Sequence, residues 1–242
     1  MRADRIVSDE GKRDEGRLQL VERLIAGTGP TYDAMVHWAT LGIDGLWKQR
    51  MLACIPEGNG PLLDLACGTG ISTLSIAHRF PRRRVVGVEL RDEYLEIARD
   101  KAKRGAIGNV DFVLCRAEDF ESALSFDCIT SSYLAKYADL PRLTRNSRAM
   151  LRPGGLLMMH DFTLPPKRLL VALWRLYFIL MRKTVARVFP GWKAIYDSLP
   201  RLIEQSRWLA ELQQALARND FADVKVDYQT LYGSAIVTAI KR

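Results

Sequence analysis

The feature that most restricts the fold is a regular alternation of short apolar runs and amphipathic stretches that begins at Pro61. Strand-like runs occupy 61–66, 84–90, 110–115, 126–133 and 156–162. Helix-like stretches occupy 70–80, 92–104 and 139–151. Strands that alternate with helices of this length predict a parallel sheet with helices on both of its faces.

The end of the chain follows a different pattern. A helix is expected over 203–219, and two strands follow at 221–228 and 231–240 with no helix between them. Closely spaced strands of this kind predict an antiparallel pair. The expected fold is therefore α/β and Rossmann-like, with a seven-stranded, mostly parallel sheet. We expect 1–29 to be a partly flexible N-terminal arm and 30–242 to be the folded domain.

Cysteine spacing and charge limit the kinds of partner. The four cysteines are widely spaced and form no CxxC pair or Cys/His cluster, so we expect a reducing, cytoplasmic setting and no metal site. The formal net charge is +8, and the segment 167–193 alone holds seven Lys or Arg and no acid. Because the positive charge is local, it argues against a nucleic-acid partner. The first residues are not apolar, so no secretory signal is expected.

A glycine turn in LLDLACGTG, residues 62–70, predicts a ligand site. Gly68 and Gly70 leave room for a ligand near the backbone, and the helix that follows points N–H groups toward it. A dinucleotide turn carries a third glycine, which is missing here. Asp64 at the strand end suits a cationic or amino-bearing ligand better than a pyrophosphate. Glu89, which ends the next strand, can accept hydrogen bonds from both ribose hydroxyls. A cationic nucleoside such as S-adenosylmethionine (SAM) satisfies both acids.

On these residues the chain resembles the class I SAM-dependent methyltransferases. The resemblance implies that the glycines pass under the methionine part of SAM and that Asp64 supports its amino end. It also implies that Glu89 binds the ribose, that Leu90 packs on the adenine, and that the adenine edge lies near 116–118. The predicted cofactor-binding residues are Asp64, Ala66, Gly68, Thr69, Gly70, Glu89, Leu90, Arg116, Ala117, Glu118, Ser131 and Ser132.

The adenine-edge residues leave an alternative open. Many members of the class carry Asp where Arg116 stands, so the side-chain contact there is not expected to be the usual one. Glu118 and Asp119 could equally be a solvated helix start.

A narrower resemblance lies in YDAMVHWATLGIDGLWKQR, residues 32–50, which is similar to a segment of the ubiquinone/menaquinone biosynthesis C-methyltransferases, the UbiE-like family. The resemblance continues to residue 242. It implies C-methylation of a demethylated, lipophilic quinone ring.

The chain departs from that family around the expected acceptor pocket. Val36 replaces an Asn, and 133–137 reads YLAKY where the family commonly reads F-G-L-R-N. A family Gly-Gly…His stretch becomes Gly233-Ser234, without the His. These changes suggest an altered substrate or ring position.

Methylation of a ring carbon needs loss of a hydroxyl proton from the acceptor. The residues expected to assist are Tyr32, Lys136 and Tyr137, with Tyr32 and Lys136 favoured by motif position. Tyr32 could instead only cap the SAM pocket, and Lys136 could be a surface lysine. His160 is a further candidate, although a hydrogen-bonded structural role suits it better.

The basic segment 167–193 combines Arg168, Arg175 and Arg182 on one helical stripe with a broad apolar surface. One hypothesis is a helix that lies on an anionic membrane surface and makes the protein peripheral there. The other is a lid, within 165–200, that buries its apolar side on the sheet. The two are compatible if the lid admits a polyprenyl tail.

Other functions remain open at this stage. A methyltransferase of another small molecule, such as a phenol or polyketide, would use the same core. RNA methylation lacks an attached RNA-binding domain and the usual motif after the fourth strand. A non-catalytic SAM-binding scaffold, or a nucleotide-binding sheet with a chance glycine turn, would carry no methyl transfer. The oligomeric state is not indicated by the sequence.

Overall fold

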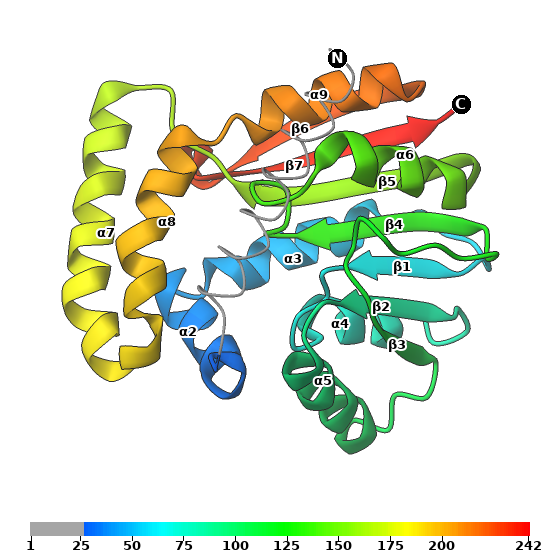
Figure 1. Ribbon diagram of the computed structural model, residues 1–242, viewed down its shortest axis with the longest axis horizontal. Coiled ribbons are helices and arrows are strands. Elements are labelled where there is room, and N and C mark those ends of the chain that lie inside the picture. Colours follow the sequence, from blue (N-terminus) through cyan, green and yellow to red (C-terminus); the bar gives the residue numbers. More distant parts are fainter. Residues whose placement is uncertain (1–26) are drawn as a thin grey trace, which may run out of the picture.

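The computed structural model describes residues 27–242, without the side chains at 185 and 186. The expected N-terminal arm therefore lies outside the described residues, except for its end at 27–29. Within that range the chain builds one central sheet, shown edge to edge in Figure 1.

The sheet has seven strands and confirms the predicted α/β fold. Their order is β3 (Val110–Leu114), β2 (Val85–Glu89), β1 (Leu62–Leu65), β4 (Phe126–Ser132), β5 (Leu151–Phe162), β7 (Ser234–Lys241) and β6 (Phe221–Gln229). Strands β1 to β5 are parallel, and β7 runs antiparallel to both β5 and β6. The chain turns back in strand order at β1, which has β2 on one side and β4 on the other. Ligand crevices of such sheets lie at this point, beyond the carboxyl ends of the strands.

Helices cover both faces, as a parallel sheet requires. On one face lie α3 (Ile43–Cys54), α4 (Ile71–Arg79) and α5 (Asp92–Arg104). On the other lie α6 (Leu140–Met150) and α9 (Trp208–Arg218). Every residue of β1 is buried because both faces are covered. α5 begins with Asp92 and Glu93 and ends with basic residues, which complements the helix dipole.

Three boundaries in the second half of the chain differ from those that the sequence predicts. The expected helix 203–219 is two helices, because α8 (Lys193–Gln205) ends before the extended Ser206 and α9 begins at Trp208. The expected strand 231–240 begins only at Ser234, since 230–232 forms a 3-10 turn with three positive φ angles. Strand β5 starts at Leu151 rather than 156, and its pairing with β4 shifts register between Phe126 and Cys128.

Three helices stand beyond the tips of β1 and β4. They are α2 (Tyr32–Ala39), α7 (Arg168–Val188) and α8, which pack together through a separate apolar cluster around Trp192 and Tyr196. Figure 1 shows α7 and α8 at the end of the sheet toward which these strands point. We call α7 and α8 the roof, because the functional cavity lies between them and the sheet.

Candidate active site

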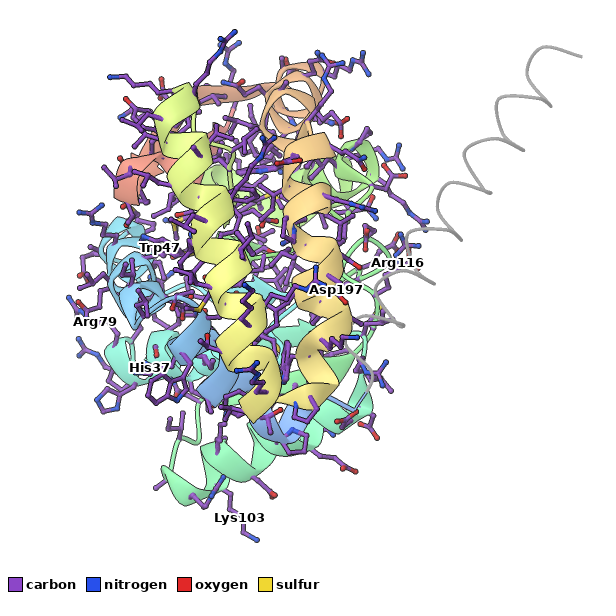
Figure 2. The ribbon with its side chains drawn as sticks, turned by 90° about the vertical axis from the view of Figure 1, so that its left-hand side faces the viewer. His37, Trp47, Arg79, Lys103, Arg116 and Asp197 are labelled. Atoms are coloured by element: carbon purple, nitrogen blue, oxygen red, sulfur yellow. The ribbon has the colours of Figure 1, made fainter. Side chains whose placement is uncertain are left out.

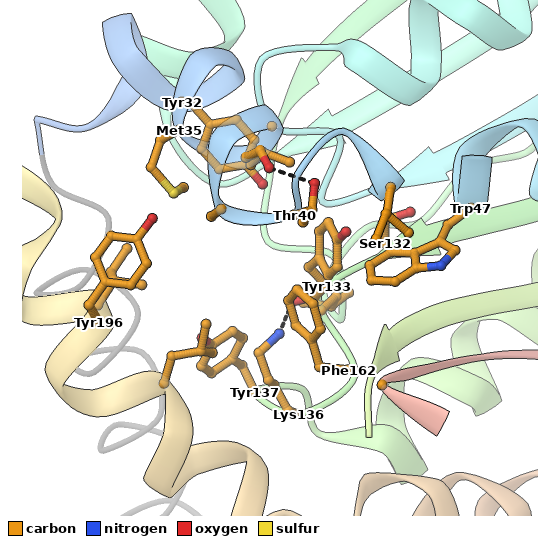
Figure 3. Close-up of a pocket in the computed structure, with 18 of the residues that line it drawn as sticks. Tyr32, Met35, Thr40, Trp47, Ser132, Tyr133, Lys136, Tyr137, Phe162 and Tyr196 are labelled. Atoms are coloured by element: carbon orange, nitrogen blue, oxygen red, sulfur yellow. Dashed lines mark hydrogen bonds between the residues drawn. The ribbon is translucent and has the colours of Figure 1, made fainter. Parts of the chain in front are cut away.

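A cavity of about 480 Å³ lies where the strand tips meet α2 and the roof. Its wall is mainly aromatic and aliphatic, and Figure 3 shows part of it. The structure brings most of the sequence-predicted site residues to this one wall. They are Tyr32, Ala66, Gly68, Glu89, Leu90, Arg116, Ala117, Glu118, Ser132, Lys136 and Tyr137.

Four predicted residues are not on the wall: Asp64, Thr69, Gly70 and Ser131. Asp64 lies behind the glycine turn, where its carboxylate accepts hydrogen bonds from Thr73 Oγ1 at 2.6 Å and Thr130 Oγ1 at 2.7 Å. Burial raises the pKa of the Asp64 carboxyl, and these two hydrogen bonds oppose that shift. Ser131 is buried within β4. These residues support the wall and do not form it.

The turn itself has the backbone shape that its glycines predict. Gly68 and Gly70 both have positive φ angles, of 56° and 81°. A Cβ at Gly70 would approach the Cβ of Ala98 to 3.0 Å, so α5 packs against this position. Glycine at 70 therefore serves helix packing, while Gly68 is the glycine that faces the cavity.

Glu89 is held by the main chain around it. Its carboxylate accepts hydrogen bonds from the N–H groups of Gly68, Leu90 and Arg91, at 2.9, 2.9 and 3.1 Å. Burial raises the pKa of Glu89, and the three backbone hydrogen bonds oppose that shift. The carboxylate is thus fixed at the cavity wall, and Oε2, which accepts only from Gly68, keeps one lone pair for a ligand.

The segment 28–33, which ends in the first turn of α2, contacts the glycine turn and α5. Thr28 and Tyr94 share a hydrogen bond of 2.5 Å between their hydroxyls. Asp33 accepts from Thr69 Oγ1 at 2.6 Å and pairs with Lys101, which also donates to the Thr69 carbonyl. The resemblance to Y-D-x-M at 32–35 marks this segment as functional, but it does not indicate which residues the segment contacts.

Glu118 is buried and Asp119 is exposed, so the alternative of a solvated helix start is wrong for Glu118. Glu118 pairs with Arg116 at 3.0 Å and accepts from the Asp139 N–H at 3.1 Å. No helix begins there, since 117–119 forms only a turn. Arg116 therefore stands beside an acid of its own chain at the cavity wall.

Lys136 is buried, and the surface alternative is wrong. Its ammonium pairs with Asp161 at 2.7 Å and donates to the Tyr133 carbonyl at 2.9 Å, while its side chain is only 3% exposed. Burial lowers the pKa of Lys136, and Asp161 opposes that shift. The ammonium also lies 4.5 Å from the ring centre of Tyr137. Figure 3 shows Lys136 and Tyr137 side by side on the wall.

A second charged group, missed by the sequence, adjoins the same wall. Tyr133 donates from its hydroxyl to Asp44 Oδ1 at 2.5 Å, and Lys48 pairs with both oxygens of Asp44. Asp44 and Lys48 are one turn apart on α3, inside the segment 32–50 that resembles the family. Tyr133 follows β4 with a positive φ of 64°. Because Asp44 and Tyr133 lie far apart along the chain, the sequence alone does not indicate this contact.

The ring of His160 makes no hydrogen bond to any described residue, contrary to the structural role expected for it. Neither ring nitrogen has a partner among the residues that the structure describes, although the residue is 1% exposed. Its ring packs between Trp47 and Tyr133, with centroids 5.3 and 5.1 Å away. Burial, Lys48 and Lys136 lower the pKa of His160 to about 3, so the ring stays neutral. Across 27–242, no His, Cys, Asp and Glu side chains gather as a metal site would require.

The roof carries the basic segment. Arg175 pairs with Glu204 at 2.8 Å and Arg182 with Asp197 at 3.0 Å, so this stripe of α7 faces α8. Figure 2 shows the two helices side by side. The opposite side of α7 exposes four leucines: Leu169, Leu173, Leu176 and Leu180. Between residues 27 and 242, no helix has both the length and the apolar content needed to cross a membrane.

The strand order reverses at β1, a glycine turn follows that strand, and an acid lies at the tip of β2. Together these features define a SAM-dependent methyltransferase. Solved methyltransferases share this fold. A geranyl diphosphate C-methyltransferase from Streptomyces coelicolor, crystallised with S-adenosyl-L-homocysteine, matches with a TM-score of 0.60 at 16% identity and covers 82% of this chain and 79% of its own. A phosphoethanolamine N-methyltransferase from Haemonchus contortus matches with a TM-score of 0.66 at 15% identity, over 92% and 59%.

The chain belongs to the ubiE/COQ5 methyltransferase family, whose model matches residues 12–241. A demethylmenaquinone methyltransferase of Bacteroides fragilis is 23% identical over 97% of this chain and 96% of its own length. A ubiquinone/menaquinone biosynthesis C-methyltransferase of Idiomarina loihiensis is 28% identical over 90% and 88%. The match extends over nearly the whole chain, as the resemblance at 30–242 predicted.

Proposed function

We propose that this protein methylates a ring carbon of a demethylated quinone in its reduced, quinol form, with SAM as the methyl donor. The observation that carries the proposal is a single cavity with two kinds of wall. One part is formed by the strand tips expected to bind SAM, and the other by aromatic side chains and the buried Lys136. A flat, apolar ring with two hydroxyls suits such a chamber, since few polar groups need partners. The named activities of the relatives support the same substrate class.

The wall residues near the strand tips fit SAM. We propose that Glu89 accepts from the ribose hydroxyls, that Leu90 packs on the adenine, and that the main chain at Ala117 meets the adenine edge. Ala66 and Gly68 would border the methionine part, where the missing side chain of Gly68 leaves room. Arg116, Glu118 and Ser132 complete this part of the wall. Asp64, Thr69, Gly70 and Ser131 would act from behind, by holding the turn and β4 in place.

Bound SAM supplies an electrophilic methyl group, so the protein must align the acceptor, exclude water and raise the electron density of the acceptor ring. Tyr32 and Tyr137 would hold the ring from two sides of the wall. Lys136 would donate a hydrogen bond to the ring oxygen as negative charge develops there. Asp161 fixes that ammonium, because it accepts from Lys136 through both Nζ and the backbone N–H.

The exposed side of α7 would serve the apolar tail of the substrate. Leu173 both lines the cavity and is exposed, so the tail could leave the chamber along Leu169, Leu173, Leu176 and Leu180. Lys183 and Arg187 continue α7 beyond these leucines and would face anionic headgroups. We therefore propose that the roof docks at a membrane surface.

Vesicle co-sedimentation tests the docking. Binding to phosphatidylglycerol vesicles should fall when Leu169, Leu176 and Leu180 are changed to Ser, and should fall less with Lys183→Glu. Leu114→Ser, at an exposed leucine on β3, is the matched control. Equal binding of all these variants would contradict the docking.

The function itself is tested by lipid extraction from a host that lacks its own quinone methyltransferase. Expression of this chain should add one methyl group to the quinone, and Glu89→Ala should abolish the gain. A panel of phenols and polyketide-type acceptors with the purified protein distinguishes the alternative of another small molecule. Methylation of such an acceptor, with unchanged quinone in the host, would sink the quinone assignment.

A further inference from the structure

Three side chains form a continuous polar connection from the inside of α3 to the cavity wall. Lys48 holds both oxygens of Asp44 at 2.5 Å, and Asp44 accepts from the Tyr133 hydroxyl at 2.5 Å. Asp44 is 6% exposed and is not part of the wall, whereas Tyr133 is. The carboxylate thus reaches the cavity only through the tyrosine.

Tyr133 is fixed in position by its surroundings. Its ring stacks on Phe162 with centroids 4.8 Å apart and an interplanar angle of 18°. Its backbone N–H donates to the His160 carbonyl at 2.8 Å. Because the hydroxyl hydrogen is committed to Asp44, the oxygen has lone pairs left to accept a hydrogen bond from a molecule in the cavity.

The charged and titratable groups around Tyr133 come from every element packed against it. They are Asp44 and Lys48 on α3, Tyr32 on α2, Lys136 after β4, and His160 and Asp161 on β5. Burial, followed by Asp44, raises the pKa of Tyr133 well above its ordinary value, so the resting side chain is a neutral phenol. A neutral phenol is a poor base alone, yet it can pass a proton to a carboxylate that it already contacts.

We propose that Tyr133 is the catalytic residue that takes the hydroxyl proton of the acceptor, with Asp44 as the final proton acceptor and Lys48 as the positioning residue. This inference rests on the proposed function. The acceptor hydroxyl gives its proton to Tyr133 Oη while Tyr133 gives its own to Asp44. The electron pair of the broken O–H bond stays on the acceptor oxygen and increases the electron density of the ring carbon.

After methylation, the proton relay formed by Tyr133 and Asp44 returns to its starting protonation state. The methylated ring carbon loses its hydrogen as a proton to solvent, and Asp44 returns its proton to the ring oxygen through Tyr133. One proton is released per turnover in total. Lys136, on the same wall, would stabilise the intermediate oxyanion. The hydrogen-bond donor to the ring oxygen, Lys136, is therefore a different group from the proton acceptor, Tyr133.

The test uses Tyr133→Phe, which keeps the ring packing and removes the hydroxyl. With SAM and a short-tail naphthoquinol, kcat at pH 7 should fall about 100-fold. The loss should shrink as the pH approaches about 10, the ordinary pKa of a phenol, because the acceptor then ionises without help. Asp44→Asn should show the same pH dependence, since it keeps a hydrogen-bond acceptor but binds no proton. Tyr228→Phe and Asp111→Asn, at exposed sites, are the matched controls.

A dye gives a readout that needs no turnover. 4-Nitrophenol changes colour when it loses its proton. Bound to the wild type with S-adenosyl-L-homocysteine at pH 6, at a concentration where calorimetry shows the site filled, it should show the anion band. With Tyr133→Phe or Asp44→Asn it should show the neutral band.

The outcomes separate the two claims. A wild type that ionises the dye but methylates no quinol supports the relay and contradicts the quinol assignment. If Tyr133→Phe remains within about threefold of the wild-type kcat with the same pH profile, the relay is overturned. The same holds if both proteins bind the dye in the same protonation state. Calorimetric SAM affinity and thermal unfolding of each variant exclude loss of folding as the cause.

Discussion

The two halves of the cavity are built in different ways. The half near the strand tips is organised around main chain, with Glu89 held by three backbone N–H groups. The half under the roof consists of aromatic side chains around two charged pairs, Lys136–Asp161 and Lys48–Asp44. The first half depends on local backbone shape, whereas the second depends on contacts between distant segments. Such a division of one cavity would suit an enzyme family in which the cosubstrate SAM is shared and the acceptor varies.

The largest expected effect concerns the charged pair under the roof. Lys136→Met should lower the free energy of unfolding by about 3–5 kcal/mol, because it leaves the buried Asp161 carboxylate unpaired. Urea unfolding measures the loss. The double variant Lys136→Met/Asp161→Asn removes the unpaired charge and should be more stable than the single variant. If the double variant were the less stable of the two, the pair would not be the cause.

The next effect concerns the other half. Glu89→Gln removes the charge and keeps only one oxygen, so its NH2 group must face either the Gly68 N–H or the N–H groups of Leu90 and Arg91. Calorimetry should then show SAM binding weakened about 100-fold, or about 2.7 kcal/mol. Binding of 4-nitrophenol should stay as in the wild type if the two halves are independent. Glu96→Gln, on the exposed side of α5, is the matched control. Equal losses of SAM binding and dye binding would show that the two halves of the cavity are not independent.

A third prediction concerns acid stability under the roof. The pKa of His160 is lowered to about 3 in the folded protein, mainly by burial, whereas an unfolded histidine titrates near 6.5. Between these values the unfolded chain binds one more proton than the folded one. The contribution of His160 to the free energy of unfolding is therefore complete above about pH 6.5. Below that pH, the free energy of unfolding falls by about 1.4 kcal/mol per pH unit.

His160→Phe tests this pH dependence, because it keeps an aromatic ring at the site and removes the titration. Its unfolding free energy should decrease less between pH 7 and pH 5 than that of the wild type. His78→Phe, at an exposed histidine, should leave the wild-type slope unchanged. Parallel slopes for wild type and His160→Phe would show that another group causes the acid sensitivity.

The smallest effect concerns the arginines of the roof. Arg175 and Arg182 are more than half exposed, so their pairs with α8 should each contribute less than about 1 kcal/mol to stability. Arg182→Ala should shift the thermal unfolding temperature only slightly. A large shift would mean that the roof is held by its charges rather than by the apolar cluster around Trp192.

The sequence predicted the half that local patterns encode. The alternation of strands and helices, the glycine turn and the acid at the tip of β2 are each short-range signals, and all of them lie where expected. It could not show that Asp64 turns away from the cavity, because the partners Thr73 and Thr130 lie on different elements. It also missed Tyr133 with Asp44, since 89 positions separate them and only the folded sheet brings α3 to the tip of β4.

The segment that ends at Tyr32 has a consequence for how the cavity can open. Its Thr28 is bonded to Tyr94 beside the glycine turn, and its Thr31 accepts from the Trp192 indole under the roof at 2.8 Å. A single strap of backbone is therefore fastened at both halves. While both hydrogen bonds hold, the glycine turn and the roof cannot move far apart, so we expect SAM binding and release of the acceptor to be coupled.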